Sequence, residues 1–170
     1  MLACNIRLGN ATGMTNIVIE GNGLIVIIGD WVLQMACAQL AVWAQNPHLA
    51  HLSIAVNVSA RQFCELNFVQ SVTEMVRQYD VAPGKLKIEL TESQLTANVG
   101  EIIGKMNELK KLGITFSLDD FGTGYSSLAF LKRLPLDQVK IDKSFVHSLA
   151  TQEDAINIIK LITGMAKSLN

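Results

Sequence analysis

At 170 residues the chain has the length of one domain and can bury a sizeable core. Apolar residues make up 49% of the sequence and the mean hydropathy is +0.30, which favours parallel strands that are buried on both faces. The net charge of −1 and the lack of a long basic run argue against a nucleic-acid duplex or an anionic membrane as a partner.

The cysteine pattern bears on the cellular compartment. Cys4, Cys37 and Cys64 are widely separated, and an odd number without metal-ligand spacing indicates a reducing environment. We therefore expect a cytoplasmic protein whose cysteines are small buried residues. The apolar stretch 17–28 is short and interrupted by Glu20, so the sequence predicts no membrane segment, and it shows no signal peptide.

The first half of the chain predicts two helices around one strand. Residues 1–16 are polar and aperiodic, and we expect them to be poorly ordered. Asp30 is the expected N-cap of a helix that ends before Pro47. Alternating β-branched residues predict a strand at 52–59, and an apolar stripe predicts a helix at 67–79.

The second half repeats this alternation. A helix is expected over 99–112, with Gly113 as its C-cap and Glu101 and Lys105 as an i,i+4 ion pair. A final helix is expected from Thr151 onward. The three further strands are expected at residues 86–91, 114–119 and 138–142.

Strands that alternate with helices over short connections indicate parallel βαβ units. Two architectures contain such units: an open doubly wound sheet and a (β/α)8 barrel. The positions of the polar strand residues help to decide between them.

Four polar side chains share one face of the predicted sheet. Counting alternate residues places Asn57, Glu89, Asp119 and Lys140 opposite the branched apolar residues, each near the carboxyl end of its strand. Any one of them alone is most often a solvated turn residue. Four on neighbouring strands predict convergence at the end of a barrel where active sites form.

The residue types in this group suggest a metal. Glu89, Asp119 and the adjacent Asp120 offer carboxylate oxygens, and Asn57 offers an amide oxygen. Such hard ligands suit Mg²⁺ or Mn²⁺ and not zinc, because no histidine or cysteine accompanies them.

The segment 120–127 (DFGTGYSS) is a second strong signal, with Gly122 and Gly124 permitting tight turns and Ser126 or Ser127 able to cap the next helix. The chain lacks the other protein-kinase motifs that would accompany D-F-G. A dinucleotide-binding G-x-G-x-x-G also fails, because its third glycine position is Ser127.

Five stretches together resemble the EAL phosphodiesterase family, in the family's order and spacing. They are GLIVIIGDWVL at 23–33, VNVSARQF at 56–63, IELTES at 88–93, LDDFGTGYSS at 118–127 and VKIDKSF at 139–145. The resemblance implies a TIM-barrel-like (β/α)8 fold that hydrolyses cyclic di-GMP to a linear dinucleotide with two divalent ions.

The resemblance also implies a role for each matching residue. Asn57, Glu89 and Asp119 are similar to the family's metal ligands, and Asp120 to a ligand of the second ion. Lys140 is similar to the lysine that holds and polarises the attacking water. Glu92 is similar to the glutamate that anchors the loop formed by Asp120, Phe121, Gly122, Thr123, Gly124, Tyr125, Ser126 and Ser127.

The sequence departs from the family pattern at both ends. Residues 1–22 contain no Glu-Ala-Leu motif, and the later family segments A-E-G-V-E and Q-G-Y are absent. We therefore divide the chain into an unmatched segment, 1–19, and a partial EAL domain, 20–170. We expect an incomplete barrel with about four matched strands, prone to self-association, with weak or no binding of cyclic di-GMP and no catalysis alone. The alternatives are a degenerate EAL protein acting as a binding or regulatory module, and an unrelated metal-dependent barrel enzyme.

Overall fold

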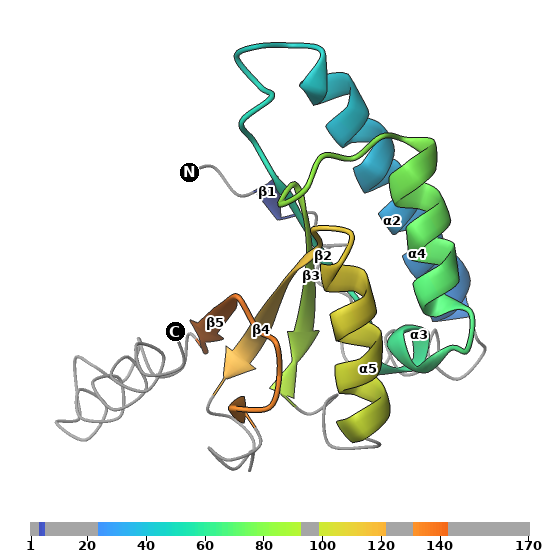
Figure 1. Ribbon diagram of the computed structural model, residues 1–170, viewed down its shortest axis with the longest axis vertical. Helices are drawn as coiled ribbons and strands as arrows, with labels where there is room; N and C mark the ends of the chain where they lie inside the picture. The colour runs from blue at the N-terminus through green and yellow to red at the C-terminus, as the bar shows by residue number, and fades with distance from the viewer. Residues whose placement is uncertain (1–3, 6–23, 93–98, 122–130, 143–170) are drawn as a thin grey trace, which may run out of the picture.

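The computed structural model describes residues 4–5, 24–92, 99–121 and 131–142, which form a parallel sheet and its helices (Figure 1). In chain order the elements are β1 (Cys4–Asn5), α2 (Leu24–Ala44), β2 (Ile54–Asn57), α3 (Ala60–Cys64), α4 (Phe68–Gln78), β3 (Leu86–Thr91), α5 (Val99–Lys110), β4 (Thr115–Phe121) and β5 (Gln138–Ile141).

The sheet has the order β1-β2-β3-β4-β5, and every neighbouring pair is parallel. Figure 1 shows the long helices α2, α4 and α5 together on one side of this sheet. A doubly wound sheet carries helices on both faces, whereas a barrel carries them only outside. The arrangement of the described elements is therefore that of a barrel wall.

The apolar core lies between the sheet and these helices. The branched residues of the strands are buried on this side, as the sequence predicts, and Phe63 of α3 packs against Phe68 and Phe116 with ring centroids 5.1 and 6.4 Å apart. Each large side chain buried here stabilises the fold by roughly 1.5–3 kcal/mol. The buried residues on this side of the sheet include Ile54, Val56, Leu86, Ile88, Leu90, Phe116 and Leu118, together with Ile114 directly before β4.

The N-terminal region differs from the prediction at two places. Cys4–Asn5 form a short strand that pairs with β2, although residues 1–16 read as aperiodic. Helix α2 begins at Leu24, so Asp30 lies inside the helix and is not its N-cap. Asp30 instead accepts a hydrogen bond from the buried Gln62 amide at 3.0 Å.

Helix α2 is, among the described residues, the one helix long and apolar enough to cross a membrane. One face of it is nevertheless part of the domain core, since five of its residues are buried against the rest of the fold. These are Val32, Leu33, Ala36, Cys37 and Leu40.

Two further features differ from the prediction, and the start of one helix agrees with it. Helix α3 was not expected, and its N-cap Ser59 accepts a hydrogen bond from the Gln62 N–H at 3.1 Å. Strand β4 continues to Phe121, past the predicted end at Asp119. Helix α5 begins at Val99 as predicted, and Gly113 follows its end with φ of +80°. The helix expected from Thr151 lies outside the described residues.

Candidate active site at the carboxyl ends of the strands

The strand register places the predicted polar residues side by side. Asn57 of β2 pairs with Glu89 of β3, and Thr91, two residues further along β3, pairs with Asp119 of β4. Lys140 of β5 reaches across β4, so that its ammonium contacts the Glu89 Oε1 atom and lies 3.7 Å from Asp119 Oδ2. The predicted convergence of Glu89, Asp119 and Lys140 is therefore observed, with Asn57 as the register neighbour of Glu89.

The charges at this point differ greatly in exposure. Glu89 is only 2% exposed, whereas the side chains of Asp119 and Lys140 are 15% and 26% exposed. A buried carboxylate is costly unless an opposite charge or hydrogen bonds compensate it. Lys140 provides that charge for Glu89 Oε1, while Glu89 Oε2 is buried without a hydrogen-bond partner among the described residues.

A β-bulge determines the direction of Asp120. Leu118 pairs with Val139 and Phe121 pairs with Ile141, so β4 contains one more residue than β5 in this interval. Both Leu118 and Phe121 are buried in the core, which strict alternation would forbid for residues three apart.

The residue that absorbs this irregularity is Asp120, whose φ is +53° and whose side chain is exposed. Its backbone N–H donates to Asp119 Oδ1 at 3.1 Å. The bulge thus allows two consecutive aspartates to lie between two core residues, which sequence alternation alone does not reveal.

The expected loop is only partly described. Phe121 is a core residue at the end of β4, and Glu92, directly after β3, is 3% exposed. The remaining loop residues, Gly122, Thr123, Gly124, Tyr125, Ser126 and Ser127, lie outside the described residues. The anchoring role of Glu92 therefore remains a prediction.

The side chains at the strand ends are of the chemical type that binds a hard divalent cation. Glu89 and Asp119 supply carboxylate oxygens at one place, and the buried Glu89 Oε2 atom has no hydrogen-bond partner in the described part of the chain. Within the described ranges, no three histidine, cysteine, aspartate or glutamate side chains already form a group that could hold a metal. The ammonium of Lys140 supplies the positive charge between these two carboxylates.

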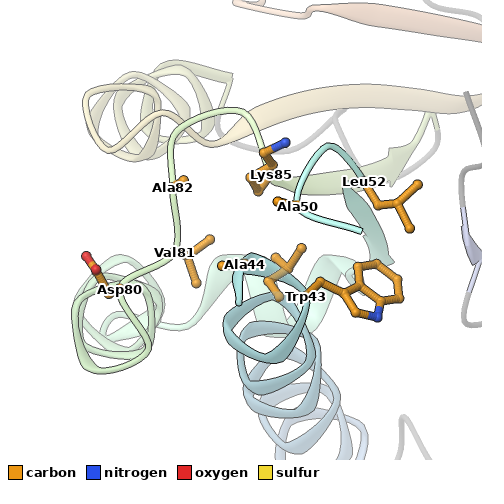
Figure 2. A pocket seen from close by; sticks show the side chains of 9 residues that line it. Trp43, Ala44, Ala50, Leu52, Asp80, Val81, Ala82 and Lys85 are labelled. Atoms are coloured by element: carbon orange, nitrogen blue, oxygen red, sulfur yellow. The ribbon is translucent and has the colours of Figure 1, made fainter. Parts of the chain in front are cut away.

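A small pocket of about 160 Å³ lies elsewhere (Figure 2). Its lining includes Trp43 of α2, Leu52 before β2 and Lys85 before β3, so it is at the amino ends of the strands. The polar cluster is at the carboxyl ends, and the pocket is therefore separate from it.

Sequence reasoning missed two parts of the surroundings of the site. The Lys105 ammonium, expected only to pair with Glu101, also donates to the carbonyl oxygens of Phe63, Cys64 and Glu65 at 2.9–3.1 Å. These carbonyls lie at the C-terminal end of helix α3. Only two residues separate the start of this helix from Asn57. A lysine contact to backbone carbonyls 40 residues away leaves no signal in the sequence.

The second residue is Ser117, which strand alternation places on the polar face but for which no role at the site was predicted; it is fully buried beside Glu89 in the sheet register. Its place on the polar face could be read from strand alternation, because it precedes Asp119 by two residues.

Comparison with known proteins places this arrangement in a family. The EAL domain model matches residues 16–170. The bifunctional diguanylate cyclase/cyclic di-GMP phosphodiesterase MucR of Pseudomonas aeruginosa is 41% identical over 151 residues, covering 89% of this chain and 22% of that protein. The cyclic di-GMP phosphodiesterase NbdA of the same organism is 39% identical, with 89% and 19% covered.

Solved structures agree with the sequence matches. The PaMucR phosphodiesterase in complex with c-di-GMP superimposes with a TM-score of 0.86 and 40% identity, covering 93% of this chain and 64% of that one. The EAL domain of Mycobacterium smegmatis DcpA gives a TM-score of 0.76 and 33% identity, with 83% and 63% covered. The chain thus spans about a fifth of these two curated relatives and less than two-thirds of these two solved chains. With its one-sided helices and its polar cluster at the strand ends, the chain belongs to the EAL domain family and has its TIM-barrel-like fold.

Proposed function

We propose that this chain is part of a cytoplasmic, metal-dependent cyclic di-GMP phosphodiesterase domain. The observation that carries the proposal is the contact of Lys140 with Glu89 and Asp119 at the carboxyl ends of adjacent parallel strands. Charged groups inside a barrel need a ligand, a metal or one another, and this end of a barrel is where active sites lie. The names of MucR and NbdA support cyclic di-GMP as the substrate.

Each residue of the site has a proposed task. Asn57, Glu89 and Asp119 would hold one Mg²⁺ or Mn²⁺ ion, and the exposed Asp120 would hold a second. A bound divalent ion neutralises phosphate charge and lowers the pKa of a coordinated water. Lys140 would orient and polarise the attacking water, because its ammonium is already fixed beside the carboxylates.

Hydrolysis of cyclic di-GMP in Mg²⁺ or Mn²⁺, followed by chromatography, tests the proposal. The 170 residues contain no Glu-Ala-Leu motif, and the loss of a metal ligand costs more than the roughly 10–100-fold that follows loss of a supporting residue. We expect no turnover by this chain alone. We expect turnover when it is joined to the family's Glu-Ala-Leu and late glutamate segments.

Two variants of the joined protein make the test specific. Asp119→Ala should abolish turnover, whereas Glu74→Gln, which changes an exposed carboxylate on α4, should leave it unchanged. Turnover that survives Asp119→Ala would remove Asp119 from the site. Turnover by the 170 residues alone that disappears in Asp119→Ala would show that the motif glutamate is dispensable.

A further inference from the structure

Three buried oxygen atoms on the polar face of the sheet have no hydrogen-bond partner among the described residues. They belong to the side chains of Glu89, Thr115 and Ser117. A buried hydroxyl or carboxylate oxygen without a partner costs free energy, so such atoms usually bind an ordered water. Two of the three, those of Glu89 and Ser117, belong to residues that are directly paired in the β3–β4 register.

Two polar contacts cross β4 on either side of Ser117. Toward the amino end, Lys87 of β3 donates to Gln138 of β5 at 2.6 Å. Toward the carboxyl end, Lys140 of β5 contacts Glu89 of β3. Ser117 lies on β4 between these contacts, and it is 0% exposed.

We propose that one water molecule binds between these two contacts, accepting a hydrogen bond from Ser117 Oγ and donating one to Glu89 Oε2. Ser117 and Glu89 side chains share a face but are not directly bonded, and a bridging water is nearly as favourable as a direct bond. The water occupies one lone pair of the second carboxylate oxygen of Glu89, while Lys140 contacts the first oxygen. Because an ionised carboxylate has about four lone-pair sites, Glu89 can still bind a metal ion.

Ser117 is therefore a positioning residue for Glu89. This inference rests on the proposed function, in which Glu89 is a metal ligand. Groups that orient a metal ligand typically contribute about 10–100-fold to metal affinity. Since Ser117 acts through one water on one ligand, we place its effect at about 10-fold, the lower end of that range.

A double-mutant cycle tests the water site without any metal. Urea unfolding is measured for the chain, Ser117→Ala, Glu89→Met and the double variant. We expect Ser117→Ala to lower the unfolding midpoint in the parent and to have a clearly smaller effect when Glu89 is already Met. Additive effects, or a midpoint raised by Ser117→Ala in the parent, would show that the hydroxyl is simply unpaired.

Thr115 provides the matched control. It also has a buried hydroxyl without a partner among the described residues, but it pairs with Lys87 and not with Glu89. Thr115→Val should show no coupling to Glu89→Met. Equal coupling at both positions would mean a general effect of the sheet and would overturn the proposal.

Mn²⁺ binding, followed by electron paramagnetic resonance, separates this inference from the proposed function. We expect Ser117→Ala to weaken Mn²⁺ binding about 10-fold and Thr115→Val to leave it unchanged. If Glu89→Met removes binding but Ser117→Ala does not change it, the positioning role is wrong and the metal site stands. If Mn²⁺ does not bind, or binds regardless of Glu89, the metal site is wrong, while the cycle still decides the water site.

Discussion

Lys140 supplies the positive charge that compensates the carboxylates at the strand ends. Its removal leaves Glu89, only 2% exposed, without the ammonium that contacts it. Loss of one partner from a buried ion pair costs about 3–5 kcal/mol, and the partial exposure of Lys140 reduces this figure. We expect Lys140→Met to lower the free energy of unfolding by about 2 kcal/mol in urea denaturation.

Divalent ions should partly reverse this loss, because a cation beside Glu89 and Asp119 would replace the missing charge. The control is Lys140→Arg, which keeps the charge and should lose less stability. A Lys140→Met variant as stable as the parent would show that Glu89 does not depend on this contact.

The two cysteines with described side chains should differ in reactivity. Burial raises the pKa of the Cys37 thiol to about 11, whereas Cys64 is exposed, so the expectation of buried cysteines is wrong for Cys64. A thiol reagent at neutral pH attacks the thiolate, so it should modify Cys64 in the folded chain and Cys37 only after unfolding. Mass spectrometry of the labelled protein identifies the sites, and rapid labelling of Cys37 in the folded chain would contradict its burial.

The raised pKa of the Cys37 thiol also makes the stability of the fold depend on pH. The unfolded thiol ionises near 9.0 and the folded one near 11, so the unfolded chain loses its proton first. This contribution to stability is complete below pH 9 and is lost as the pH rises toward 11. Unfolding midpoints measured across this range in a Cys4→Ser/Cys64→Ser background should fall more than those of the same protein with Cys37→Ala.

Individual residues show what alternation can and cannot predict. The face shared by Glu89, Asp119 and Lys140 follows from a period of two along each strand, and the ion contacts agree with it. Asp120 could not be placed this way, because a bulge adds one residue and breaks the period. The metal, water and loop-anchoring roles of these residues remain predictions.

At the level of elements, the end of helix α3 is bound by a single side chain from another helix, α5. The last carbonyls of a helix lack partners within it, and Lys105 of α5 binds three carbonyls at the end of α3. Hydrogen bonds to charged groups contribute about 1.5–3 kcal/mol, so Lys105→Met should lower the free energy of unfolding by about 2 kcal/mol.

The control for this prediction separates the carbonyl contacts from the ion pair. Glu101→Gln removes only the exposed partner of Lys105 and should cost less than about 0.5 kcal/mol. If both variants lose the same stability in urea denaturation, the carbonyl contacts do not matter.

The start of α2 shows why some boundaries are hidden. Asp30 followed by an apolar run reads as an N-cap, but the preceding residues are equally apolar and continue the helix. Asp30 is tolerated inside it because Gln62 donates a hydrogen bond to it. Gly29 leaves the space for that amide, since a Cβ there would be 2.1 Å from Gln62 Oε1. Such a long-range contact cannot be inferred from local pattern.

At the scale of the whole molecule, the outer side of α2 is unusually apolar. Several large apolar side chains recur there at helical spacing and are 46–67% exposed: Leu24, Ile27, Trp31, Met35 and Val42. Exposed apolar surface of this kind favours association.

We expect the chain to self-associate with increasing concentration in sedimentation velocity, and Trp31→Lys to reduce this. Leu66→Lys is the control, because Leu66 is 97% exposed but belongs to the turn between α3 and α4 and not to α2. A monomer at all concentrations, or equal effects of the two variants, would contradict the prediction.

The alternation of strands and helices could be predicted along the chain, because the period of the apolar residues within each short segment indicates whether it is a strand or a helix. The positions of strands β2 to β5 agree with the prediction to within a few residues. Strand β1 was missed since two residues cannot display a period.

The identical order of strands in the sheet and in the chain has a consequence for biosynthesis. Each described strand after β1 pairs with the described strand before it in the chain, and the long helices α2, α4 and α5 that separate β1, β2, β3 and β4 pack on the same side of the sheet. No described strand must wait for a partner from a later part of the chain. The sheet can therefore grow at one edge during translation, each new unit adding to a template that is already folded.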